Sequence, residues 1–141
     1  MPDEEEPVGP VDFDVLDRIG ARLSGSSRFE RVSFRPAVAP NSVLATYDTG
    51  YLPAAIEVAR LRVIWFETDD FHVHYSEQYS SGEQWECRWD RHPNAHNTRA
   101  HFHPPPDAAT PGEDTEYATD WRELLSTVLT ELDDRIEGFW D

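Results

Sequence analysis

The sequence predicts an α+β domain in which an antiparallel, meander-like β-sheet carries a long C-terminal helix on one face and a short helix precedes it. Segments in which apolar and polar residues alternate recur from residue 28 to residue 103, separated by turns rich in Gly, Pro, Asn and Asp. Such alternation is typical of consecutive strands. The end of the chain instead repeats its apolar residues at helical spacing. Strands followed by a helix favour an α+β architecture.

The N-terminal region combines an acidic tail with a short helix. Residues 1–10 are acidic and rich in proline, so we expect them to be disordered and to precede a single domain over residues 11–141. From Val11 to Leu23 the apolar side chains form one stripe, which predicts a helix. Asp12 can cap its start and Gly25 can end it.

The predicted strands follow one another closely. They cover residues 28–35, 42–47, 54–66, 71–75, 84–89 and 98–103. In the third of these, the apolar phase changes near Ala59 and Arg60, which suggests a bulge or a bend. In the fifth, Cys87 is in phase with Trp85 and Trp89, which favours a buried small side chain over a nucleophile. Residues 107–116 are expected to form a polar loop.

The C-terminal helix has the clearest pattern in the sequence. Seven apolar residues from Trp121 to Ile136 fall on one helical face. Asp120 can cap its N-terminus, and Gly138 stands where the helix is expected to end. Phe139 and Trp140 are expected to fold back onto the core.

The charge of the chain is strongly negative. It contains 28 acidic and 12 basic residues, for a net charge of −16, and every basic residue is arginine. This composition resembles that of proteins from extreme halophiles, in which about 1 M salt shortens the Debye length to about 3 Å and screens surface repulsion. A negative net charge therefore does not exclude a nucleic-acid ligand.

Several protein classes are excluded or disfavoured. No apolar run of about 18 residues is present, so no membrane association is expected. A single cysteine excludes an intramolecular disulfide and fits a reducing cytoplasm. The sequence contains no Gly-rich phosphate loop, no His-Glu-x-x-His and no Gly-x-Ser-x-Gly motif.

Residues suited to acid–base and phosphate chemistry concentrate between Trp85 and Pro106. A first cluster lies at and just after the end of a strand, where a loop can hold functional groups on a rigid scaffold. Arginine is a planar donor suited to phosphate, and histidine exchanges protons near neutral pH. The cluster comprises Arg88, Asp90, His92, Asn94 and His96. The alternative is an ordinary Arg88–Asp90 pair on a solvated strand face.

A second cluster consists of Arg99, His101 and His103. In an extended segment these side chains point to the same side, about 6.5–7 Å apart along the strand. They could bind a phosphate or a metal, or act as acid and base, although any alternating strand would give the same spacing. His72 and His74 share another strand face. If the two strands were neighbours, the two His-x-His pairs could form a four-histidine metal site.

The order of these motifs resembles a known family. Arg88-Trp89-Asp90 ends an aromatic-rich strand, a loop with Pro, Asn and His follows, and His101-Phe102-His103 precedes prolines and the final helix. This order resembles the TumE-type toxins of prokaryotic toxin–antitoxin pairs over about residues 61–136. The resemblance implies a cytoplasmic protein that acts on RNA and is neutralised by a cognate antitoxin.

This resemblance is compatible with RNA cleavage that needs neither metal nor cofactor. One histidine would take the proton of the 2′-OH and another would protonate the leaving oxygen, while arginine stabilises the phosphate charge. His101 and His103 are the predicted acid–base pair, with His92 as a third catalytic candidate. The predicted substrate-binding residues are Arg88, Arg99, Asp90, Asn94, His96 and Trp89, with Asp90 orienting Arg88 or His92 and with Trp89 and Phe102 stacking on bases.

Two other functions fit the same residues. The first is a non-catalytic protein of the same fold that binds a partner protein or nucleic acid. The second is a metal-dependent hydrolase that uses the two His-x-His pairs. Convergence of Arg88, His92, His101 and His103 on one concave surface would favour catalysis, and side chains that point to different sides would exclude it.

Overall fold

A computed structural model of the chain describes residues 9–92, 100–110 and 112–140. The elements appear in chain order as α1 (Phe13–Ser24), β1 (Phe29–Arg35), β2 (Ser42–Tyr47), β3 (Ile56–Trp65), β4 (Phe71–Tyr79), β5 (Gln84–Arg91), β6 (Ala100–His103), β7 (Glu113–Asp114) and α2 (Trp121–Gly138).

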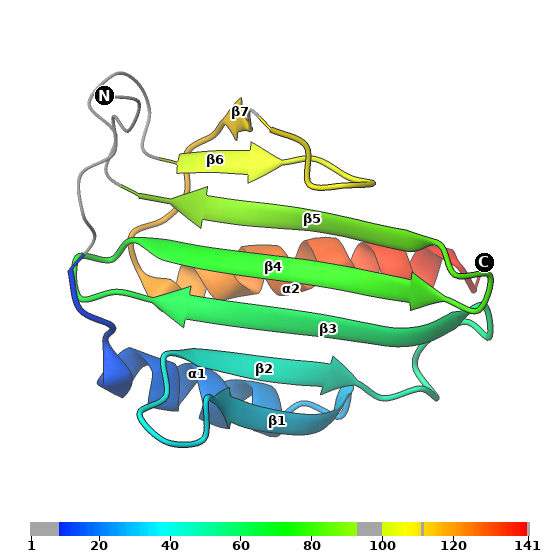
Figure 1. Cartoon of the computed structure of the whole chain (residues 1–141), viewed down its shortest axis with the longest axis horizontal. Helices are drawn as coiled ribbons and strands as arrows, with labels where there is room; N and C mark the ends of the chain where they lie inside the picture. Colours follow the sequence, from blue (N-terminus) through cyan, green and yellow to red (C-terminus); the bar gives the residue numbers. More distant parts are fainter. Residues whose placement is uncertain (1–8, 93–99, 111, 141) are drawn as a thin grey trace.

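The strands form one seven-stranded sheet in the order β1 to β7, and every neighbouring pair is antiparallel (Figure 1). Each strand pairs with the next along the chain because short connections favour neighbours in space. The predicted α+β meander is therefore confirmed. β4 and β5 are longer than expected, and the short strand β7 lies inside the segment predicted to be a polar loop.

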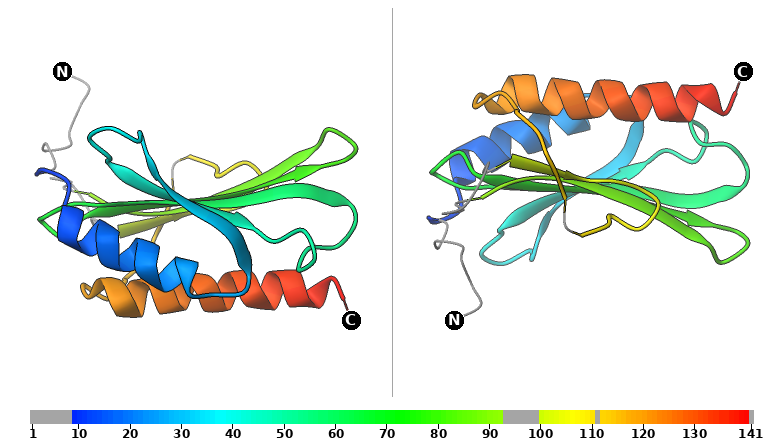
Figure 2. Two further views of the ribbon diagram at one scale, coloured as in Figure 1. Left: turned by 90° about the horizontal axis from the view of Figure 1, so that it is seen from below. Right: turned by 90° about the horizontal axis from the view of Figure 1, so that it is seen from above.

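Both helices cover the same face of the sheet (Figure 2). α1 packs against β1, β2 and β3, and α2 lies behind the centre of the sheet (Figure 1). The alternating apolar residues of the strands point toward the helices and form the core with them. The largest fully buried side chains are Trp65, Trp89, Tyr47, Tyr75, Phe71, Leu16, Ile19, Leu23, Leu61, Leu124, Leu125 and Leu132.

The helix ends largely follow the sequence prediction. The Asp12 side chain accepts a hydrogen bond from the Val15 backbone N–H at 3.0 Å and caps α1. Asp120 caps α2, which extends through Gly138. The aromatic residues that follow are not buried: Phe139 is 42% exposed and Trp140 58%. The expectation that they fold back onto the core is therefore wrong, although the Trp140 indole donates a hydrogen bond to the Tyr51 carbonyl.

The irregularity expected in β3 is present but lies earlier in the strand. The pairing of β3 with β4 shifts between Ile56 and Val58, rather than near Ala59. The reason is that Ala59 is fully buried and pairs with Glu77, so it already belongs to the phase that faces the helices.

Most of the predicted acidic tail, residues 1–8, lies outside the described residues. Next to it, the Pro10 carbonyl accepts a hydrogen bond from Glu67 at the β3–β4 turn. None of the helices described here has the length and apolar character needed to cross a membrane.

A buried ion pair joins β4 to α2. The Glu77 carboxylate is 1% exposed and accepts two hydrogen bonds from the Arg135 guanidinium, at 2.9 and 2.8 Å. The hydroxyls of Tyr75 and Tyr79 donate to the same carboxylate. The guanidinium carbon lies 3.3 Å from the centroid of the Trp85 ring. This pair links the sheet to the helix through the apolar layer.

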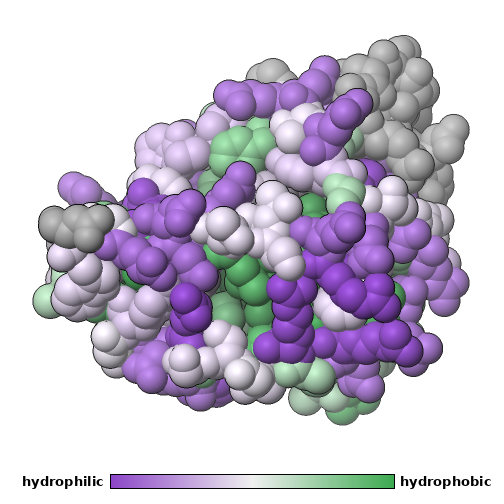
Figure 3. Space-filling model, turned by 180° about the vertical axis from the view of Figure 1, so that it is seen from behind, coloured by the Kyte–Doolittle hydropathy of each residue, from purple (hydrophilic) through white to green (hydrophobic). Residues whose placement is uncertain are grey.

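The face of the sheet opposite the helices is polar, and we call it the open face. Seen from the side, the β1–β2 and β4–β5 turns both rise away from the helices (Figure 2). The helix side is mostly hydrophilic on its outside, with hydrophobic side chains showing in the middle (Figure 3). By strand alternation, the regular positions of β1–β6 place on the open face five arginines and four histidines against two carboxylates. They are Arg31, Arg35, Arg60, Arg62, Arg88, His72, His74, His101, His103, Glu86 and Asp90.

Candidate functional site

The buried carboxylate of Asp90 is the centre of the histidine cluster. Asp90 is 2% exposed and lies near the end of β5. One of its oxygens faces His72 Nδ1 at 3.0 Å. The other accepts a hydrogen bond from Arg88 Nε at 2.8 Å and lies 3.0 Å from His103 Nε2. Three neighbouring strands therefore place their polar side chains on a single acidic group.

The contacts of Asp90 keep it ionised. Burial raises the pKa of its carboxyl, but the hydrogen bond and charge of His72 and the guanidinium of Arg88 act in the opposite direction. The outcome is a pKa below the usual value for aspartate. A fixed negative charge at this position can orient both His72 and Arg88.

The four histidines around Asp90 form a row across the sheet. Ring centroids are 6.2 Å apart for His72 and His92, 5.4 Å for His92 and His101, and 6.4 Å for His101 and His103. His72 and His92 are partly exposed, whereas His101 and His103 are buried, at 8% and 5% exposure.

The ring nitrogens of His72, His101 and His103 differ in what they contact. Because a carboxylate only accepts hydrogen bonds, His72 Nδ1 carries a proton toward Asp90, and the neutral ring has its lone pair on Nε2. His101 Nδ1 faces Asp114 of β7 in the same way, at 3.2 Å. His103 is held on both sides: Nδ1 lies 3.1 Å from the Ala109 carbonyl, and Nε2 is in contact with Asp90 and Arg88.

A cavity of about 430 Å³ opens beside these groups. It is lined by His72, Arg88, Asp90, His92, His103 and Thr110. Two residues after Thr110, Gly112 packs directly on the buried histidines. A Cβ built on Gly112 would lie 2.9 Å from the His103 ring and 3.1 Å from His101 Cβ. A glycine is needed there for the loop to approach so closely.

The family model of the toxin TumE matches residues 18–136. The chain belongs to the TumE toxin family. The match starts well before Leu61, where the sequence resemblance began, and so takes in most of α1 and the first strands of this TumE-family toxin. Comparisons with curated proteins and with solved structures find no match.

Membership of the TumE family identifies the chain as a relative of toxins from toxin–antitoxin systems, which makes a cognate antitoxin a plausible partner.

Some of the site residues that were predicted from the sequence lie close together in the structure. Arg88, Asp90, His92 and His103 line one cavity, and His101 lies next to His92. Asn94, His96 and Arg99 lie outside the described residues.

Trp89 lies on the opposite side of the sheet from the histidines of this TumE-family protein. It is 2% exposed, its indole N–H donates to Glu131 of α2, and its ring packs against Phe102. A base bound at the histidine cavity does not reach either ring, because the odd-numbered positions of β5 face the helices. The predicted stacking of RNA bases on Trp89 and Phe102 therefore has no geometric basis.

The predicted four-histidine metal site requires that the strand with His72 and His74 be a direct neighbour of the strand with His101 and His103. The two strands are not neighbours. β5 lies between β4, which carries His72 and His74, and β6, which carries His101 and His103. Arg88 and Asp90 occupy the space between the two pairs. Across the described part of the chain, no group of three or more His, Cys, Asp or Glu side chains is arranged to hold a metal ion.

Sequence reasoning missed two parts of the site. It considered His72 only as a metal ligand, although His72 is the histidine that Asp90 orients toward the cavity. It gave no role to Arg60 and Arg62, which share the open face. Both signals were present in the sequence as alternation, Arg60-x-Arg62 and His72-x-His74. The meander order places them on the same face as Arg88, with β4 next to β5 and β3 one strand further away.

Cys87 is expected to be chemically inert in the folded protein. It is 3% exposed, and burial raises the pKa of its thiol to about 12. Iodoacetamide at about pH 8 should therefore leave the folded protein unlabelled and modify it after unfolding in urea, as followed by mass spectrometry. Rapid labelling of the folded protein would contradict this placement of the thiol.

Proposed function

We propose that this TumE-family toxin cleaves RNA in the cytoplasm at the cavity lined by His72, Arg88 and Asp90, without a metal ion, and that a cognate antitoxin neutralises it. The observation that carries the proposal is the convergence of acid–base and cationic groups on one cavity of the open face. A guanidinium, a histidine oriented by a buried carboxylate and a second histidine are the groups that phosphodiester cleavage requires.

In the proposed reaction, His72 Nε2 takes the proton from the 2′-OH of the RNA. The freed O2′ forms a bond to phosphorus, and the bond from phosphorus to O5′ breaks. His92 supplies the proton to the leaving O5′, so the products are a 2′,3′-cyclic phosphate and a 5′-hydroxyl. The two ring centres lie 6.2 Å apart, so both imidazoles can contact the same phosphate at the cavity.

The remaining residues of the cluster hold these groups in place. Arg88 faces the phosphate and stabilises the charge that develops on its oxygens. Asp90 fixes the tautomer of His72 and the orientation of Arg88. His103, predicted as a catalytic group, is engaged at both ring nitrogens, so we assign it a positioning role. His101 supports His92 from behind, 5.4 Å away.

Substituting His72 by asparagine tests the proposal. The variant should lose at least about 100-fold in cleavage rate at saturating RNA, because general acid–base catalysis typically contributes that much. Gln78→Asn is the matched control, since Gln78 lies on the same face of β4 but does not line the cavity. The measurement is the cleavage of a labelled RNA in EDTA, with mass spectrometry of the product ends. Equal rates for the two variants, or loss of all activity in EDTA, would contradict the proposal.

A second candidate function is RNA binding without cleavage. It is favoured by the burial of His101 and His103, whose exposed fractions of 8% and 5% and internal hydrogen bonds are typical of structural histidines. In that case the purified protein would bind RNA and arrest growth, but it would leave the RNA intact, and His72→Asn would retain the arrest.

A further inference from the structure

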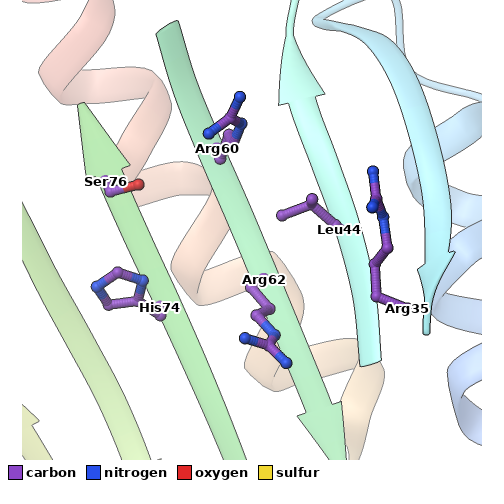
Figure 4. A pocket seen from close by; sticks show the side chains of 6 residues that line it. All are labelled: Arg35, Leu44, Arg60, Arg62, His74 and Ser76. Atoms are coloured by element: carbon purple, nitrogen blue, oxygen red, sulfur yellow. The ribbon is translucent and has the colours of Figure 1, made fainter. Parts of the chain in front are cut away.

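The open face continues from the histidine cavity into a second hollow with a different lining, which we call the arginine groove. It has a volume of about 410 Å³ and is lined by Arg35, Leu44, Arg60, Arg62, His74 and Ser76. Figure 4 shows Arg60 and Arg62 on β3, with His74 and Ser76 of β4 on one side and Leu44 of β2 and Arg35 of β1 on the other. Only one of the six side chains is aliphatic.

Two of the three arginines of the groove contact hydroxyl groups. Arg62 Nε donates to the Ser42 hydroxyl and Arg35 Nε to the Ser33 hydroxyl, each at 3.3 Å. Within the described ranges, none of the groove's three arginines forms a salt bridge with a carboxylate. Elsewhere in this acidic chain, arginines do pair: Arg28 with Asp133 and Arg135 with Glu77.

Placing like charges side by side has an energetic cost. Arg60 and Arg62 point to the same face and stand about 7 Å apart along the strand. Like charges this close repel one another and destabilise a sheet, even where solvent weakens the effect. A chain with 28 acidic residues has carboxylates in excess, so an unpaired cationic cluster indicates an anionic ligand.

The groove and the histidine cavity lie on one line across the sheet. Strand pairing sets Arg62 opposite His74, His74 opposite Arg88, and Arg88 opposite His103. Neighbouring strands are about 4.8 Å apart, so Arg62 lies about 10 Å from Arg88, and β1, which carries Arg35, lies about 19 Å from β5. That length accommodates several consecutive phosphates of a nucleic-acid strand.

We propose that the arginine groove binds the phosphodiester backbone of a single RNA strand whose scissile phosphate lies in the histidine cavity. This inference rests on the proposed function and deepens it, because it makes the substrate a strand of several nucleotides rather than a dinucleotide. Guanidinium groups match phosphate oxygens in geometry and charge. An acidic protein segment is the competing ligand, but a groove with a single aliphatic side chain lacks the apolar pocket that anchors protein partners.

Paired substitutions distinguish the effect of the groove arginines on RNA binding from the effect of the chain's net charge. Arg60→Gln/Arg62→Gln removes two positive charges from the groove, and Arg18→Gln/Arg122→Gln removes two from the helices. Both are made in the His72→Asn background, and binding of a labelled, unstructured RNA of about twelve nucleotides is followed by fluorescence anisotropy. KCl is varied from about 0.2 to 1 M, which keeps the repulsion among the surface carboxylates screened.

The groove pair should weaken RNA binding at the lowest salt by at least about tenfold. It should also reduce the slope of log affinity against log salt by about 1.4, because each phosphate contact on a single strand contributes about 0.7. The helix pair should leave both quantities near those of the parent. Equal effects of the two pairs would overturn the groove as an RNA site. Unchanged RNA binding with loss of antitoxin binding would also overturn it and would identify a protein-binding surface.

A cleavage assay with His72 restored distinguishes failure of the groove from failure of the catalytic proposal. With the groove pair, cleavage of a dinucleotide should proceed at the parental rate, and cleavage of the longer RNA should fall in parallel with its binding. A fall in dinucleotide cleavage equal to that of the longer RNA would count against an extended groove. If the parent binds RNA without cutting it and the groove pair abolishes binding, the groove stands and the ribonuclease mechanism fails.

Discussion

Asp90→Asn is expected to remove most of the proposed RNA-cleaving activity and to destabilise the fold. The carboxylate is buried and joins Arg88, His72 and His103. An amide cannot accept from all three, and it leaves the Arg88 guanidinium without a counter-charge. We expect a loss of about 3 kcal/mol in the free energy of unfolding and a fall in cleavage rate of at least about 100-fold. Urea unfolding followed by tryptophan fluorescence, at constant KCl, and the RNA cleavage assay measure the two effects.

The same substitution should change how stability depends on pH. The folded pKa of Asp90 lies below its ordinary value, so its ionised form stabilises the protein above about pH 4, and this contribution is lost as the pH falls further. The parent should therefore lose stability below about pH 4 more steeply than Asp90→Asn, which has no carboxyl to protonate. Gln78→Asn, on the same face of the neighbouring strand β4, is the control and should keep the parental steepness, because it removes no carboxyl. Identical curves for the parent and Asp90→Asn would contradict the assignment.

Arg135→Ala is expected to be the most destabilising single change outside the site. It leaves the Glu77 carboxylate, whose side chain is fully buried, without its partner, and removes the cation from above the Trp85 ring. Breaking a buried pair on one side typically lowers the free energy of unfolding by about 3–5 kcal/mol. Urea denaturation at constant KCl measures the change.

Two controls test the cause of this effect. Arg122→Ala removes an arginine from an exposed pair with Asp120 on the same helix, which should change the free energy of unfolding by less than about 1 kcal/mol. The double variant Glu77→Gln/Arg135→Ala should be more stable than Arg135→Ala alone, because it no longer buries an unpaired charge. A double variant that is less stable by the sum of the two single effects would mean that the pair does not act as a unit.

Most of the fold could be predicted because its signals are local. Alternation along 42–47 and the stripe from Trp121 to Ile136 each report which side of an element is buried, and a meander requires only that each strand pair with the next. The strand β7 could not be predicted, since two residues carry no periodic pattern. The burial of Phe139 and Trp140 was predicted wrongly, because aromatic residues alone do not reveal whether a surface is available to cover them.

The candidate site was predictable in location but not in its internal contacts. Arg88 and Asp90 are two residues apart, so their shared face follows from alternation alone. That His72 meets Asp90 depends on the register between β4 and β5, which no local pattern specifies. The burial of His103 depends on a loop whose Gly112 packs on its ring, and a glycine in a polar segment gives no sign of such an approach.

α2 follows β1 to β7 in the chain, so the strands are synthesised before the helix that covers the centre of the sheet. The buried face of α2, with Leu125, Val128 and Leu132, forms the second layer beneath the sheet. Until residues 121–138 have left the ribosome, Trp89 lacks its partner Glu131 of α2. We therefore expect the strands that carry His72 and Asp90 to hold their register less firmly at that stage. The contacts that join Asp90 to His72 are therefore expected to form only after α2 has been translated.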